Sequence, residues 1–243
     1  MTDLLVGFLF IFVIMVAYFA YDTQLQSQQY TELDEYISDA IDARDSLVLD
    51  ILGDLNNEGI QAKIGRSNNI ITISGQSLFQ SGSSNLYKKP GALERVDALS
   101  KILYERIKCH TFSSAYQITH LDIKNCNPKL MFIEVVFIEG HTDNVPVNRR
   151  LLDGSRTNLD LSARRAINTY QRLVETKGEL KELQNPNGEQ VLSVAAYGEQ
   201  RPMVINIGRI NRSKNRRIDI LIDMHTPTNI DEYSQLLSKI KTI

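Results

Sequence analysis

An aspartate, Asp3, stands directly before an apolar run of the sequence, residues 4–21 (LLVGFLFIFVIMVAYFAY). A carboxylate at the N-terminal end of such a run has two possible roles. It can bind and release a proton, because ionisable groups at membrane depth usually face a protein partner or an ion path. It can also cap the helix N-terminus in the headgroup layer, where its charge suits the helix dipole. Position alone favours the capping role.

Asp143 and Arg165 offer binding chemistry rather than catalysis. A fixed carboxylate opposite a guanidinium suits a ligand that carries both an ammonium and a carboxylate group. The alternative is a structural salt bridge at the surface. His141 lies close to Asp143, but no nucleophile elbow or metal-ligand spacing accompanies it. We therefore interpret His141 as a packing and turn residue and predict that the chain is not an enzyme.

The apolar run of roughly 18 residues is just long enough to cross a hydrocarbon core of about 30 Å as a helix. It lacks a basic n-region and exceeds the usual h-region of about 7–15 residues, which favours a retained anchor over a cleaved signal peptide. The first positive side chain after it is Arg44, beyond an acidic flank that an exported side tolerates. We predict a transmembrane helix over residues 1–21.

The formal net charge of −2 gives no general attraction to nucleic acid, so we expect no nucleic-acid partner. Cys109 and Cys126 bracket a polar stretch without metal-ligand spacing. If this stretch is exported, a disulfide worth about 3 kcal/mol by loop entropy is expected. If it is cytoplasmic, the two residues are free thiols. His110 and His120 lie in the same stretch, and we interpret them as solvated loop histidines rather than metal ligands.

After the run, residues 22–58 predict a linker helix, because apolar residues recur every three and four positions. Such a helix either pairs with a second copy of itself or docks on the domain that follows. Gly59 ends the helix, and residues 60–64 and 70–74 alternate as a β-hairpin.

The remaining elements predict an α+β sandwich with helices on one sheet face. We expect a loop at 76–83, helices at 91–108 and 161–177, a fully buried strand at 132–138, and a last strand pair at 192–196 and 218–223. Arg216 and Arg217 begin that last strand and point to opposite faces, which predicts one ion-paired and one exposed arginine. The tail, residues 226–243, is expected to hold a packing helix.

Four motifs occur in order within residues 70–223: Gly140-His141-Thr142-Asp143, the segment 158–166 (NLDLSARRA), Tyr197-Gly198, and the segment 215–218 (NRRI). Together they resemble the peptidoglycan-binding domain shared by outer-membrane protein A and the MotB stator subunits. The resemblance implies that residues 59–225 form an OmpA-like domain without a cofactor. It also implies that Asp143 and Arg165 clamp the diaminopimelate of a peptidoglycan stem peptide. Asn158, near the helix N-cap, and Leu161 are expected to line the same helix face.

The layout of the whole chain resembles ion-driven stator B subunits, and Thr2-Asp3-Leu4-Leu5 is similar to their ion-site motif. This resemblance moves the interpretation of Asp3 from cap to proton carrier. It implies a homodimer in the bacterial inner membrane, a periplasmic C-terminal domain, and a multi-span A subunit in five copies.

The chain is most similar to the ZorB family in three features. These are the sequence of residues 7–12, the short spacing from the span to the domain, and the insertion that contains the two cysteines. ZorB is the B subunit of the Zorya anti-phage motor. A flagellar MotB-type stator subunit and a passive OmpA-like wall anchor are the alternatives.

Overall fold

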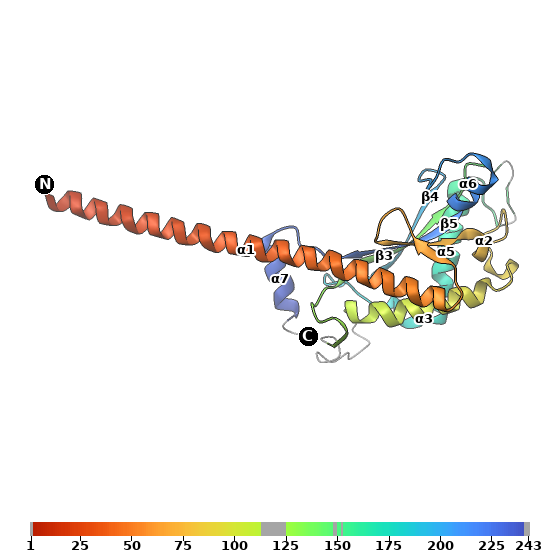
Figure 1. Ribbon diagram of the computed structural model, residues 1–243, viewed down its shortest axis with the longest axis horizontal. Helices are drawn as coiled ribbons and strands as arrows, with labels where there is room; N and C mark the ends of the chain where they lie inside the picture. The colour runs from red at the N-terminus through yellow and green to blue at the C-terminus, as the bar shows by residue number, and fades with distance from the viewer. Residues whose placement is uncertain (1, 113–124, 148–149, 152, 241–243) are drawn as a thin grey trace. The chain divides into compact units, whose positions relative to one another are not determined.

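The computed structural model describes residues 2–112, 125–147, 150, 151 and 153–240, and for residues 2–4 it describes the backbone alone. The chain divides into two compact units (Figure 1). One combines Met1–Asp39 with Thr226–Thr242, and the other is Ala40–His225.

Helix α1 (Thr2–Asn57) contains both the apolar run and the predicted linker helix without a break. Among the described residues it is the one helix long and apolar enough to cross a membrane, with a mean hydropathy of 2.2 in its most apolar window. The large apolar side chains from Leu5 to Tyr21 are exposed, as a lipid-facing surface requires. The predicted apolar helix is therefore confirmed.

Within the first unit, helix α7 (Ile230–Ile240) packs on α1. The rings of Tyr36 and Tyr233 lie 5.4 Å apart, and Leu236 is buried. The packing helix predicted for the tail is thus confirmed.

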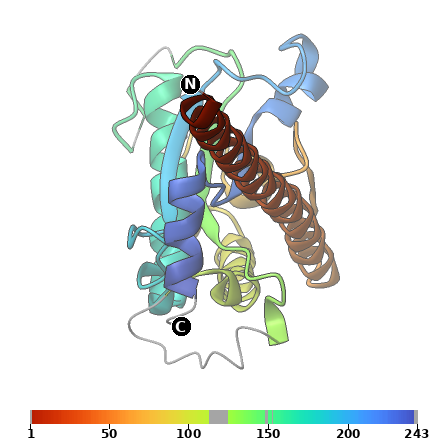
Figure 2. The same cartoon turned by 90° about the vertical axis from the view of Figure 1, so that its left-hand side faces the viewer.

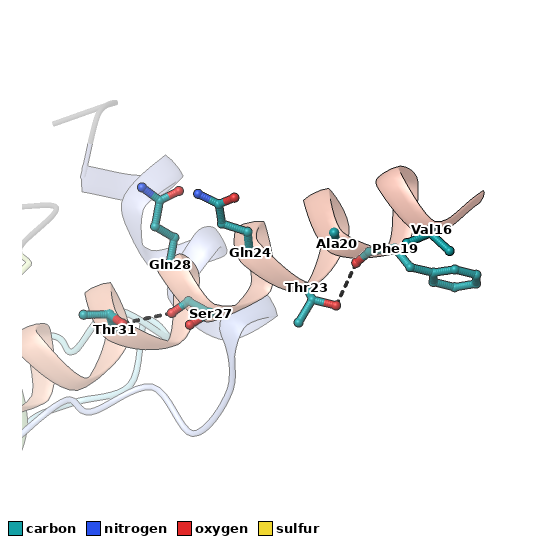
Figure 3. Close-up of a pocket in the computed structure, with 8 residues that line it drawn as sticks. All are labelled: Val16, Phe19, Ala20, Thr23, Gln24, Ser27, Gln28 and Thr31. Atoms are coloured by element: carbon teal, nitrogen blue, oxygen red, sulfur yellow. Dashed lines mark hydrogen bonds between the residues drawn. The ribbon is translucent and has the colours of Figure 1, made fainter. Parts of the chain in front are cut away.

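One face of α1 carries a hollow lined by side chains of this helix alone (Figure 3). Thr23 Oγ1 donates to the carbonyl of Phe19 at 2.7 Å, and Thr31 Oγ1 donates to that of Ser27 at 2.9 Å. Both hydroxyl protons are therefore satisfied inside the helix. The lining residues recur every three or four positions: Val16, Phe19, Ala20, Thr23, Gln24, Ser27, Gln28 and Thr31.

The second unit is built on a five-stranded sheet in the order β1-β2-β5-β3-β4. All neighbours are antiparallel except β3 and β4, which are parallel. The hairpin is confirmed, but the expected last strand pair is wrong, since β3 lies between β4 and β5. The strands are β1 (Ala62–Ile64), β2 (Ile70–Ser74), β3 (Ile133–His141), β4 (Leu192–Gly198) and β5 (Arg217–Met224).

Helices α3 (Ala92–Ile107) and α5 (Asn158–Thr176) cover one face of the sheet, with α5 on β3 and β4 and α3 against α5 (Figure 2). Strand residues alternate between the two faces of the sheet, and the apolar residues of β3 and β5 occupy the positions that face these helices. They include the fully buried Val136, Ile138, Ile218, Ile220 and Ile222. Both predicted helices are confirmed.

The part of α1 from Ala40 onward belongs to the second unit and docks there, as one of the two expected arrangements requires. Val48, Ile51 and Leu55 are fully buried. Arg106 of α3 donates to Asp54 of α1 at 2.7 Å, which ties the two helices together at the surface. This part of α1 is therefore integral to the domain.

Three local features of the structure differ from what the sequence predicted. The expected loop 76–83 begins with a short helix, α2 (Gly75–Leu78), which is too short to show helical periodicity. Helix α6 (Gly208–Asn215) was not predicted because its sequence, GRINRSKN, lacks an apolar stripe. Strand β3 is longer than expected and only partly buried in its first half. Short 3-10 helices lie at η1 (Leu86–Lys88), η2 (Lys108–His110) and η3 (Gly178–Lys181).

Candidate functional site

Asp143 lies just beyond the carboxyl end of β3 and is 6% exposed. Its Oδ1 accepts a hydrogen bond from the backbone N–H of Val145 at 3.1 Å. Its Oδ2 accepts one from Nη1 of Arg216. The carboxylate is therefore oriented by one backbone donor and one guanidinium.

Arg165 projects from α5 and is 3% exposed. Its Nε donates to the carbonyl of Ser83 at 3.0 Å, and its Nη2 donates to that of Gln80 at 3.5 Å. The guanidinium also lies over the ring of Phe79, 5.2 Å from the centroid. Arg165 thus fixes the loop after α2 beside the site.

Arg216 lies close enough to Arg165 to affect its pKa. Burial, helped by the nearby Arg216, lowers the pKa of Arg165 to about 10, although Asp143 opposes the shift. Arg165 therefore remains protonated at neutral pH. Asp153 also opposes the shift, so two carboxylates and two guanidinium groups act on one another in this region.

Asn158 begins α5, and its Nδ2 donates to the carbonyls of Asp143 at 3.2 Å and Val145 at 3.1 Å. The N-cap is Thr157, in a capping box with Asp160, so Asn158 lies next to the N-cap, as expected. Leu161, on the same helix, is 6% exposed and packs in the core. Asn158 thus holds the segment that carries Asp143, while Leu161 is a core residue.

Close contact between β3 and α5 depends on Gly140. A Cβ atom at this position would lie 2.1 Å from the carbonyl oxygen of Ser162, so any side chain would push the helix away. Ser162 Oγ in turn accepts from the N–H of Gly198 at 2.9 Å. These contacts place Asp143 and Arg165 at the same end of the domain.

Arg216 was missed as a candidate. The expectation of one ion-paired and one exposed arginine is right for Arg217, which is ion-paired with Asp219, but Arg216 is ion-paired as well, with Asp143. Asn215 anchors the preceding loop through four hydrogen bonds, including one from its Nδ2 to the carbonyl of Val204 at 2.8 Å. The alternation of strand residues predicted that the two arginines point to opposite faces, but it did not predict their ion-pair partners.

His141 was interpreted as a packing and turn residue. Its burial agrees with a packing role, but it ends strand β3 and does not lie in a turn. It is buried with Glu139 and Asp219, and its ring stacks on Tyr197 at a centroid distance of 5.3 Å. Burial alone would raise the pKa of Asp219, but His141 and Arg217 bring that pKa below its ordinary value. This cluster lies on the sheet face opposite α5.

Cys109 and Cys126 form the predicted disulfide, with their Cα atoms 6.0 Å apart. His110 is not a solvated loop residue, because Nδ1 contacts the carbonyl of Met131 at 2.9 Å. Burial lowers the pKa of His110. His120 lies outside the described residues.

Asp3 lies in the first turn of α1. Its side chain lies outside the described part of the chain, so the proton-carrying role remains a prediction.

Comparison with known proteins agrees with this architecture. A model of the OmpA family matches residues 123–216. Motility protein B of Bacillus subtilis (strain 168) is 36% identical over 88 residues, which is 36% of this chain. The matched stretch covers 29% of that relative's length.

One solved structure is similar in fold, and a second aligns with a lower score. A putative MotB-like protein from Desulfovibrio vulgaris has a TM-score of 0.50 at 20% identity, over 79% of this chain and 99% of that one. The periplasmic domain of Helicobacter pylori MotB (residues 90–256) has a TM-score of 0.48 at 19% identity, over 76% and 91% of the two chains.

Proposed function

We propose that this chain, whose C-terminal part is a MotB-like OmpA domain, is the B subunit of an ion-driven stator that is anchored to peptidoglycan. One observation carries the proposal. Asp143, oriented by Arg216, lies at the same end of the sheet as the buried Arg165. This arrangement follows an apolar helix that is long enough to span a membrane.

The ligand is the diaminopimelate end of a peptidoglycan stem peptide, which carries an ammonium and a carboxylate on one carbon. Asp143 receives the ammonium, because its buried carboxylate is held by fixed donors. The ligand carboxylate meets Arg165 and Arg216, and the side chain of Arg216 is 24% exposed. Asn158 supports the segment that carries Asp143, while Leu161 is a core residue.

At the membrane, Asp3 carries the proton, and a multi-span A subunit supplies the polar surroundings that such a carboxylate requires. Five A subunits surround a dimer of this chain. The domain remains in the periplasm and holds the dimer still while the A-subunit ring turns in the inner membrane.

Of the stator classes, the Zorya anti-phage motor is favoured by the insertion that contains Cys109 and Cys126. The similarity to Motility protein B supports a flagellar stator as the second candidate. A passive wall anchor shares the whole domain and differs only at Asp3.

Purification of this chain with the multi-span protein encoded beside it tests the motor assignment. Native mass spectrometry or electron microscopy then gives the stoichiometry. The proposal predicts five partners around two copies of this chain, with Asp3 inside the ring. Isolation of this chain alone, with Asp3 at the lipid headgroups, would instead support the passive anchor.

A further inference from the structure

Three buried ionisable side chains meet on the sheet face opposite α5, outside the proposed peptidoglycan site. Within the described part of the chain, Glu139, His141 and Asp219 form a group whose ligand atoms all lie within 4.8 Å of one another. The register of β3 and β5 places Glu139 directly opposite Asp219. Like charges in such cross-strand positions destabilise a sheet, so a positive charge is needed between them.

The neighbouring side chains supply part of that charge. Nε of Arg217 donates to Oδ2 of Asp219 at 2.8 Å, and Arg217 is 1% exposed. The two carboxylates carry one more negative charge than the guanidinium of Arg217 balances. A buried charge without a counter-ion is costly, so a proton or a metal ion must balance it.

The geometry around His141 favours a metal ion over a hydrogen bond. Nε2 lies 3.3 Å from Oδ2 of Asp219 and 3.6 Å from Oε2 of Glu139. Neither ring nitrogen makes a hydrogen bond, although the residue is 1% exposed. Ligand atoms held at about 2.0–2.2 Å from one tetrahedral metal ion lie about 3.3–3.6 Å from each other. The observed spacings match that arrangement.

One oxygen of each carboxylate already accepts a hydrogen bond from a hydroxyl group. Thr72 Oγ1 donates to Oδ1 of Asp219 at 2.6 Å, and the hydroxyl of Tyr197 donates to Oε1 of Glu139 at 3.2 Å. Hydrogen bonds of this kind orient the ligands of metal sites. The second oxygen of each carboxylate lies near His141. Of these, Oδ2 of Asp219 also accepts the hydrogen bond from Arg217.

A cavity of about 250 Å³ lies beside the cluster. It is lined by Thr72 and Arg217, which both contact Asp219. Lys63 and Lys214 also line it, so positive side chains surround the cavity.

We propose that Glu139, His141 and Asp219 bind one divalent transition-metal ion of the Zn²⁺ class, through the imidazole and one oxygen of each carboxylate. One nitrogen and two oxygen ligands suit Zn²⁺ or Mn²⁺ better than Ca²⁺, which prefers six to eight oxygens. The bound ion joins the end of β3 to the start of β5. It thereby fixes the two strands that carry Asp143 and Arg216.

The test uses the full chain purified in detergent, stripped with EDTA and titrated with ZnCl₂ by calorimetry, with bound metal counted by mass spectrometry. We expect one ion per chain and a higher melting temperature with Zn²⁺. Glu139→Gln should weaken binding at least tenfold. The control His225→Gln removes a remote histidine that pairs with Glu134 and should bind as the unmodified chain does.

A milder variant covers the case that Glu139→Gln does not fold. Tyr197→Phe removes only the hydroxyl that holds Glu139 and should weaken Zn²⁺ binding several-fold. The proposal is overturned if the unmodified chain binds no Zn²⁺. It is also overturned if both variants bind like the unmodified chain, or if NMR shows His141 protonated on both nitrogens in the presence of saturating Zn²⁺.

Discussion

Arg216 Nη1 donates to Oδ2 of Asp143, so the first residue after α6 is ion-paired with the carboxylate at the end of β3. This pair joins two segments that are distant in the sequence. It also means that a ligand ammonium meets a carboxylate that is already oriented. Arg216 is thus both a positioning residue for Asp143 and a cation at the rim of the proposed site.

Arg216→Gln should therefore weaken binding of a diaminopimelate-containing stem peptide. A hydrogen bond between charged groups contributes about 1.5–3 kcal/mol, which corresponds to a loss of about tenfold or more in affinity. Calorimetry with the purified peptide measures the effect. Arg209→Gln removes the same charge from the exposed surface of α6 and should leave the affinity unchanged. Equal affinities for the two variants would exclude this role of Arg216.

The disulfide should stabilise the domain by restricting the unfolded chain. Replacing Cys109 and Cys126 together by serine should lower the unfolding free energy by about 3 kcal/mol. For a domain of this size, that corresponds to a decrease in melting temperature of about 6–12 °C. Thermal unfolding of the two proteins gives the comparison, and identical melting temperatures would contradict it.

His110 should make stability depend on pH. Burial favours the neutral imidazole in the folded state, so the pKa is lower there than in the unfolded chain. As the pH falls through the ordinary value of about 6.5, the unfolded chain takes up the proton first, and the unfolding free energy decreases. His110→Gln should show a smaller decrease between neutral and mildly acidic pH in urea unfolding. Parallel pH profiles would refute this.

Much of the fold follows from local patterns, because each helix or hairpin carries its own periodicity. Apolar spacing was sufficient for α3, and alternation was sufficient for the β1–β2 hairpin. The strand order was not accessible in this way. Insertion of β5 between β2 and β3 depends on contacts between distant segments, which no local pattern records.

The same limit applies to the candidate site. Asp143 and Arg165 were identified from residue types and from the motifs around them. The pairing of Arg216 with Asp143, and the meeting of Glu139 with Asp219, both depend on the register of β3 and β5. A prediction of that register would have found both.

Asp3 distinguishes a motor from a passive anchor. Asp3→Asn keeps the size of the side chain but removes its ability to bind and release a proton. It should abolish phage protection, or motility if the motor is flagellar, while the complex with the A subunit still assembles. Normal function of this variant in the same cells would show that Asp3 carries no proton.

Peptidoglycan binding through Asp143 is the central claim, and sedimentation of the full chain in detergent with purified diaminopimelate-type peptidoglycan tests it most directly. Asp143→Asn keeps an acceptor for the N–H of Val145 but loses the charge that receives the ligand ammonium. Asp50→Asn makes the same change at an exposed side chain of α1 and serves as the control. We predict that the unmodified chain and Asp50→Asn sediment and that Asp143→Asn stays in the supernatant. Equal sedimentation of all three proteins, or of none, would contradict the account.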